Sequence, residues 1–123
     1  MRHTDKLWDG FSLIQDDRFF KLGQDSMLLS AFASPPPRAK VLDLGCGNGA
    51  LGVLLCARYP GLDVTGLEIQ PEVAELAQEN VVWNRLDARM RIVCGDLKQY
   101  KQLFPTGAFE YIICNPPYFS QDS

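Results

Sequence analysis

The sequence predicts an α/β fold built around one parallel sheet. From residue 40 onward, short apolar runs typical of buried strands alternate with longer segments of helical periodicity. The first of these runs leads directly into a turn with glycines at Gly45, Gly47 and Gly49, and a helical pattern begins at Ala50. Strands that alternate with helices are joined by right-handed crossovers, so the strands are expected to be parallel.

The N-terminal part of the chain is predicted to contain a β-hairpin. Residues 12–15 and 18–21 have strand character, and the polar pair Asp16 and Asp17 lies between them as a turn. We expect the N-terminus itself to fray, so His3 is given no role.

A short helix is expected after the hairpin. Asp25 or Ser26 can cap a helix that extends to about residue 32. The stiff proline run at residues 35–37 then separates two regions. The predicted organisation is a hairpin and helix cover over residues 1–37, followed by the core over residues 38–123.

The core is expected to contain four strands with helices between them. The strands are placed at residues 41–44, 64–67, 90–94 and 109–114. The helices are placed at residues 50–59, 71–83 and 97–103. In the second of these helices Pro71 suits the first turn, and Glu72 and Glu75 complement the positive end of the helix dipole.

Composition indicates a single soluble domain. Hydrophobic residues make up 46% of the chain and charged residues 22%, and no apolar run approaches membrane-spanning length. The N-terminus lacks the apolar core of a signal peptide, so we expect a cytoplasmic protein with no membrane partner. The net charge of −3 argues against strong autonomous binding to nucleic acid, which depends on basic surface.

The four cysteines do not form a metal site in the sequence pattern. Cys46, Cys56, Cys94 and Cys114 show neither a Cys-x-x-Cys pair nor a spacing to histidine typical of metal ligands. Small buried thiols are the expected interpretation, and no metal is predicted.

Polar residues at the strand ends predict a ligand cleft. Each of the four core strands carries a polar residue at or beside its carboxyl end, namely Asp43, Glu68, Asp96 and Asn115. In an open parallel sheet, ligands bind beyond the carboxyl ends of the strands. Four polar groups at this edge, beside a glycine-rich turn, therefore favour a binding site over four unrelated strand ends.

The acidic residues favour a cationic ligand over a dinucleotide. Residues 47–52 match the pattern G-x-G-x-x-G, but the carboxylate of Asp43, in the strand before the turn, would repel a pyrophosphate. A sulfonium ligand with a cationic amino group and no phosphate suits Asp43 instead. Glu68 is placed to accept both ribose hydroxyls, and Asp96 can accept a hydrogen bond from an adenine amino group.

These motifs resemble those of class I S-adenosylmethionine-dependent methyltransferases. The resemblance lies in the run Asp43-Leu44-Gly45-Cys46-Gly47-Asn48-Gly49, in Glu68 and Asp96, and in the tetrad Asn115-Pro116-Pro117-Tyr118. It implies a Rossmann-like sheet and S-adenosylmethionine as cofactor. The cofactor-binding residues would be Asp43, Gly45, Gly47, Gly49, Glu68 and Asp96, and the catalytic residues Asn115, Pro116, Pro117 and Tyr118.

The tetrad is similar to that of enzymes that methylate planar amino groups. The side-chain oxygen of Asn115 and the carbonyl oxygen of Pro116 can accept hydrogen bonds from the two N–H groups of such an amino group. This arrangement aims the nitrogen lone pair at the methyl group. Pro117 stiffens the backbone, and Tyr118 offers a stacking face for an extruded base.

The segment at residues 20–29 resembles the one that precedes the core in bacterial tRNA(Val) adenine-N6 methyltransferases. This favours adenine in tRNA as the substrate. A glutamine side chain of a release factor, guanine in rRNA and a non-catalytic cofactor-binding fragment are the alternatives, and a nicotinamide-binding module is disfavoured by Asp43 and the tetrad.

The chain stops soon after the tetrad, whereas members of the family continue with further strands to a seven-stranded sheet. We therefore expect a sheet that is truncated after its fourth strand. Residues 111–114 would then form an open edge, through which the chain could self-associate.

Overall fold

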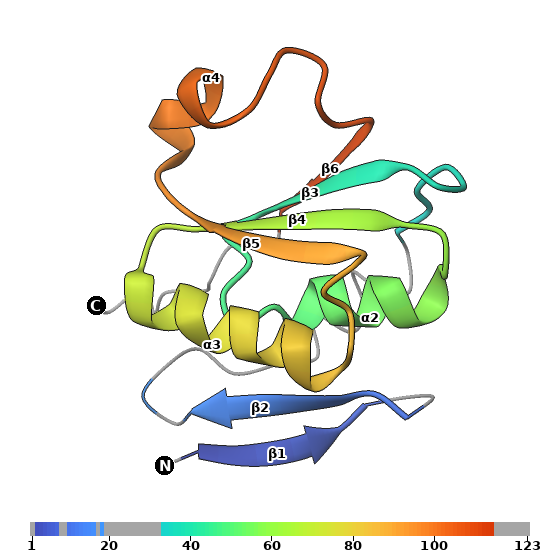
Figure 1. Ribbon diagram of the computed structural model, residues 1–123, viewed down its shortest axis with the longest axis vertical. Coiled ribbons are helices and arrows are strands. Elements are labelled where there is room, and N and C mark those ends of the chain that lie inside the picture. Colours follow the sequence, from blue (N-terminus) through green and yellow to red (C-terminus); the bar gives the residue numbers. More distant parts are fainter. Residues whose placement is uncertain (1, 8–9, 17, 19–32, 115–123) are drawn as a thin grey trace, which may run out of the picture.

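The computed structural model describes residues 2–7, 10–16, 18 and 33–114. Within these residues the protein has a four-stranded parallel sheet and a separate two-stranded hairpin (Figure 1). Helices α2 and α3 lie between the sheet and the hairpin, and α4 lies on the other side of the sheet (Figure 1). The expected α/β architecture is therefore confirmed.

The sheet has the strand order β5-β4-β3-β6. Its strands are β3 (Lys40–Leu44), β4 (Asp63–Glu68), β5 (Met90–Cys94) and β6 (Tyr111–Cys114). All three neighbouring pairs are parallel, so the carboxyl ends of the four strands meet at one edge. The central strand β3 is buried on both faces, as expected for a parallel sheet covered by helices.

The helices correspond closely to the sequence prediction. Helix α2 spans Ala50–Arg58 and α3 spans Pro71–Trp83, with Pro71 in its first turn. The last crossover contains the short 3₁₀ helix η1 (Leu97–Gln99) and α4 (Tyr100–Leu103). Every residue of α2 from Ala50 to Cys56 is buried. The leucines of the sequence indicate one buried face, whereas the helix is covered on more than one side.

The hairpin differs from the prediction. Strand β2 (Ser12–Asp16) pairs antiparallel with β1 (Arg2–Lys6), a preceding strand that the sequence does not predict. His3 therefore lies in a paired strand opposite Gln15 and not in a frayed terminus. All five residues of β1 are exposed, so the strand has no alternation of apolar and polar residues that the sequence could reveal.

Asp16 is the last residue of β2, whereas the sequence analysis places it in a turn after the strand. Its carboxylate binds the guanidinium of Arg18, with 2.9 Å between Asp16 Oδ2 and Arg18 Nη2. The predicted strand residues 19–21 and the predicted helix that extends to residue 32 lie outside the described residues.

The cysteines divide into two buried and two exposed thiols. Cys46 and Cys56 are buried, as expected, whereas Cys94 and Cys114 are exposed. The expectation of burial is wrong for the second pair because these residues end β5 and β6, the two outer strands of the described sheet. In the described part of the chain, no group of three or more His, Cys, Asp or Glu residues is arranged to hold a metal ion.

No helix among the residues that the structure describes combines the length and the apolar character needed to cross a membrane.

Candidate functional site

The glycine-rich turn joins β3 to α2 at the carboxyl edge of the sheet. Gly45, Gly47 and Gly49 have φ angles of 64°, 56° and 87°, a left-handed conformation that side chains other than glycine adopt with strain. Apart from its chain neighbours, no atom of the described residues lies within 4 Å of a Cβ built on Gly45 or Gly47. The turn therefore presents bare backbone toward open space, where a ligand can approach it closely.

Glu68 at the end of β4 stabilises this turn through hydrogen bonds. Its Oε1 accepts a hydrogen bond from the Gly47 N–H at 2.9 Å, and its Oε2 accepts one from the Gln70 N–H at 3.0 Å. The side chain is buried. Each carboxylate oxygen has two lone-pair directions, so Glu68 keeps acceptor capacity for a ligand while it holds the turn.

Asp43 is a buried carboxylate in the strand that leads into the turn. Its side chain is only 1% exposed, and neither carboxylate oxygen has a hydrogen-bond partner among the described residues. Burial, with a smaller contribution from the negative charge of Glu68, raises the pKa of Asp43 to about 7. A buried carboxylate is stable as an ion only when it is paired, so this position favours a cationic group.

The thiol of Cys46, within the turn, is neutral at physiological pH. Burial raises its pKa well above the usual range, and the charges of Asp43 and Glu68 act in the same direction. Its side chain packs against β4 at Gly66, where a Cβ atom would lie 2.8 Å from the Cys46 sulfur. A nucleophilic role for this thiol is therefore disfavoured.

Asp96 follows β5 at the same edge and begins η1. Its side chain accepts a hydrogen bond from the Lys98 N–H at 3.0 Å, and the side chain of Gln99 accepts one from the Asp96 N–H at 3.4 Å. This reciprocal arrangement is a capping box. Asp96 thus has a local structural role in addition to the predicted contact with a ligand.

Two apolar residues at this edge were not anticipated from the sequence. Ile69 directly follows Glu68 and is 58% exposed, and Leu97 directly follows Asp96 and is 52% exposed. Large exposed apolar side chains beside two acidic groups can flank a planar ring whose polar atoms bind the acids. Each of them directly follows a carboxylate at or just after the end of a strand, and this position in the sequence is the signal that could have identified it.

The predicted cofactor-binding residues lie at one edge of the described sheet. Strands β3, β4 and β5 are parallel, so their carboxyl ends share one edge of the sheet. Asp43 lies in β3, Glu68 ends β4, and Asp96 follows β5, so these residues and the turn lie at that edge. Strand β6 ends at Cys114, which is paired in register with Leu44. Asn115, Pro116, Pro117 and Tyr118 follow it in the chain and lie outside the described residues.

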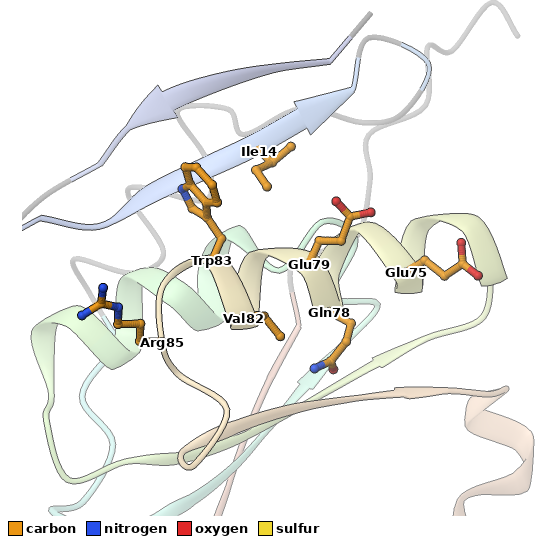
Figure 2. A pocket seen from close by; sticks show the side chains of 7 residues that line it. All are labelled: Ile14, Glu75, Gln78, Glu79, Val82, Trp83 and Arg85. Carbon is orange, nitrogen blue, oxygen red and sulfur yellow. The ribbon is translucent and has the colours of Figure 1, made fainter.

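A separate hollow of about 650 Å³ lies along α3, and Ile14 of the hairpin contributes to its lining (Figure 2). It is lined by Ile14, Glu75, Gln78, Glu79, Val82, Trp83 and Arg85. Most of these residues belong to α3, and none is a predicted site residue. The hollow is therefore distinct from the candidate site at the carboxyl edge.

The parallel sheet, with a glycine-rich turn after its first strand, defines a Rossmann-like α/β domain. The chain belongs to the methyltransferase small domain family, whose model matches residues 22–123.

Curated relatives are named tRNA1(Val) (adenine(37)-N6)-methyltransferases. The one from Vibrio campbellii is 32% identical over 110 residues, covering 89% of this chain and 45% of the relative. The one from a Flavobacteriaceae bacterium is 33% identical over 109 residues, covering 89% and 46%. The chain thus spans about half the length of the curated relatives that it matches.

Solved structures show the same fold. A predicted O-methyltransferase from Agrobacterium tumefaciens superposes with a TM-score of 0.68 at 29% identity, over 77% of this chain and 50% of that one. The fold and the family of the resemblance are therefore confirmed.

Proposed function

We propose that this chain is the cofactor-binding part of an S-adenosylmethionine-dependent methyltransferase that modifies the exocyclic amino group of adenine in tRNA. The observation that carries the cofactor is Asp43, a buried carboxylate without a hydrogen-bond partner in the described structure. The cationic amino group of S-adenosylmethionine supplies the charge that this position requires, and no phosphate is present to be repelled.

The other residues of the edge suit the remaining parts of the cofactor. The bare backbone at Gly45 and Gly47 admits the ligand, and the free acceptor sites of Glu68 suit the ribose hydroxyls. Asp96 suits the adenine amino group, with Ile69 and Leu97 on the faces of the ring. When bound, S-adenosylmethionine supplies a methyl group on a sulfonium centre.

The acceptor is activated by positioning in this proposal. An exocyclic amino group is a weak nucleophile because its lone pair is delocalised into the ring. The side-chain oxygen of Asn115 and the carbonyl oxygen of Pro116 accept hydrogen bonds from its two N–H groups, and Tyr118 stacks on the base. Pro116 and Pro117 fix the backbone that presents these groups.

The named activity of the relatives supports tRNA as the substrate, together with the likeness of residues 20–29 to the segment before the core in the tRNA(Val) enzymes. The chain itself carries a net charge of −3, so we infer that much of the tRNA contact involves other surfaces of the full-length protein. A protein glutamine and guanine in rRNA remain the alternative acceptors.

Incubation of the full-length protein with labelled S-adenosylmethionine tests the proposal. Total tRNA, rRNA, DNA and a release factor are offered separately, and label is expected in tRNA, as N6-methyladenine after nuclease digestion. Label in the release factor or in guanine would show that the proposed substrate is wrong, while the assignment as a methyltransferase would stand. Failure to bind S-adenosylhomocysteine in calorimetry would overturn the cofactor assignment itself.

A further inference from the structure

Asn80 of α3 is a polar residue with 0% exposure, and both the oxygen and the nitrogen of its side-chain amide are hydrogen-bonded. Its Oδ1 accepts a hydrogen bond from the Ile14 N–H at 2.6 Å. Its Nδ2 donates one hydrogen bond to the Ile14 carbonyl at 3.0 Å and another to the Asn48 carbonyl at 2.9 Å. A single side chain thus connects the hairpin strand β2 with the glycine-rich turn.

Asn84, one helical turn further along α3, makes a similar contact with the hairpin but not with the turn. Its Oδ1 accepts from the Ser12 N–H at 2.8 Å, and its Nδ2 donates to the Ser12 carbonyl at 2.7 Å. Its second donor bond is to the carbonyl of Asn80, within the same helix. The two asparagines therefore dock the edge of β2 onto α3 in the same way, and only Asn80 reaches the candidate site.

The turn needs such support because three of its residues are glycines. A glycine-rich segment loses more conformational entropy when it is ordered than other segments do. Glu68 fixes it from the sheet through the Gly47 N–H, and Asn80 fixes it from the helix through the Asn48 carbonyl. The side chain of Asn48 in turn accepts a hydrogen bond from the Ala50 N–H at the start of α2.

We propose that Asn80 is a positioning residue that couples the N-terminal hairpin to the cofactor turn. With Asn80 held by Ile14, its second N–H bond is aimed at Asn48, and the turn is kept in the shape that a ligand meets. The hairpin then contributes to cofactor affinity although it lies on the far side of α3 from the sheet (Figure 1). The identity of the ligand rests on the proposed function, whereas the coupling does not.

The test compares Asn80→Ala with its matched control Asn84→Ala in the full-length protein. Both variants weaken the docking of the hairpin, but only the first frees the turn. Calorimetry is expected to show a loss of about tenfold or more in affinity for S-adenosylhomocysteine for Asn80→Ala, and less than about twofold for Asn84→Ala. Equal losses of affinity in the two variants would show that Asn80 only stabilises the fold, and this result would overturn the proposal.

A second pair of variants approaches the coupling from the hairpin. Ile14→Pro removes the N–H that binds Asn80, and Ser12→Pro removes the N–H that binds Asn84. If Asn80→Ala fails to fold, this pair tests the coupling instead. Ile14→Pro is then expected to reduce the affinity for S-adenosylhomocysteine more than Ser12→Pro does. No difference within the pair would count against coupling.

Hydrogen exchange separates this inference from the proposed function. Without any ligand, the amides of residues 47–50 are expected to exchange faster in Asn80→Ala than in Asn84→Ala. If the unmodified protein does not bind S-adenosylhomocysteine, the cofactor assignment fails, and the exchange rates alone decide on the coupling. Unchanged exchange at the turn in Asn80→Ala would refute it.

Discussion

Asp43→Asn is expected to stabilise the ligand-free protein and to impair its cofactor site. The asparagine amide has the size of the protonated acid and carries no charge, so the variant mimics Asp43 with its proton bound. The ordinary pKa of an aspartate, 3.8, is raised to about 7 at this position. Because a tenfold change in proton affinity corresponds to about 1.4 kcal/mol, ionised Asp43 destabilises the fold by about 4 kcal/mol.

The dependence on pH follows from the two proton affinities. Between about pH 4 and pH 7 the folded protein keeps the proton on Asp43, whereas the unfolded chain has lost it. This group therefore makes the ligand-free protein less stable as pH rises through that window, and its full cost is present above pH 7. The gain in Asp43→Asn should reach about 4 kcal/mol at pH 8 and disappear near pH 4.

Urea denaturation of the ligand-free protein at pH 8 and pH 5 measures this gain. Glu68→Gln is the matched control, because Glu68 is also buried but accepts two backbone hydrogen bonds. It should lose stability at pH 8, where Asp43→Asn gains it. If Asp43→Asn is no more stable than the unmodified protein at pH 8, the reasoning about an unpaired carboxylate is refuted.

Four further predictions follow from the described structure and the proposed function. Glu68→Ala should weaken S-adenosylmethionine binding by about tenfold or more, from the loss of about 1.5–3 kcal/mol, and unchanged affinity in calorimetry would remove Glu68 from the site. Asn115→Ala should abolish methyl transfer by the full-length protein and leave cofactor affinity nearly intact; retention of more than about a tenth of turnover would contradict the positioning mechanism. Gly66→Ala should cost about 1–3 kcal/mol in thermal or urea unfolding, because the new Cβ would lie 2.8 Å from the Cys46 sulfur, and a neutral result would show that this contact relaxes freely. The 123-residue chain should self-associate at micromolar concentration through β6, which has a neighbour on one side only within the described sheet and exposes 55% of Ile112; a stable monomer in sedimentation would argue against this edge.

The order and type of the core elements could be predicted from sequence because their local signals agree. Helix α3 begins at Pro71 and β5 spans Met90–Cys94, as the pattern indicates. Strand β6 begins two residues later than expected, at Tyr111. The apolar signal of Phe109 comes from its ring, which packs edge-on against Phe104 with centroids 5.0 Å apart, and not from strand pairing.

Features that depend on tertiary contacts could not be predicted. Asn80 and Asn84 are four residues apart and so lie on one face of α3, and their role appears only once β2 is placed beside that face. In the candidate site, the grouping of Asp43, Glu68 and Asp96 follows from strand ends in a parallel sheet, which is a topological rule. Their roles toward a ligand stay predictions, as do those of the tetrad after Cys114.

The division of the cysteines gives the protein two built-in reporters. Cys46 and Cys56 are buried, and burial raises the pKa of the Cys56 thiol to about 11, so neither should react readily with an alkylating reagent. Cys94 and Cys114 are exposed at opposite margins of the sheet, one preceding Asp96 and the other preceding Asn115. If the proposed function is correct, a bound cofactor should protect Cys94, and a bound acceptor should protect Cys114, which directly precedes the predicted catalytic residue Asn115. One unmodified sample could thus distinguish the two binding events without a mutation or a fluorescent tag.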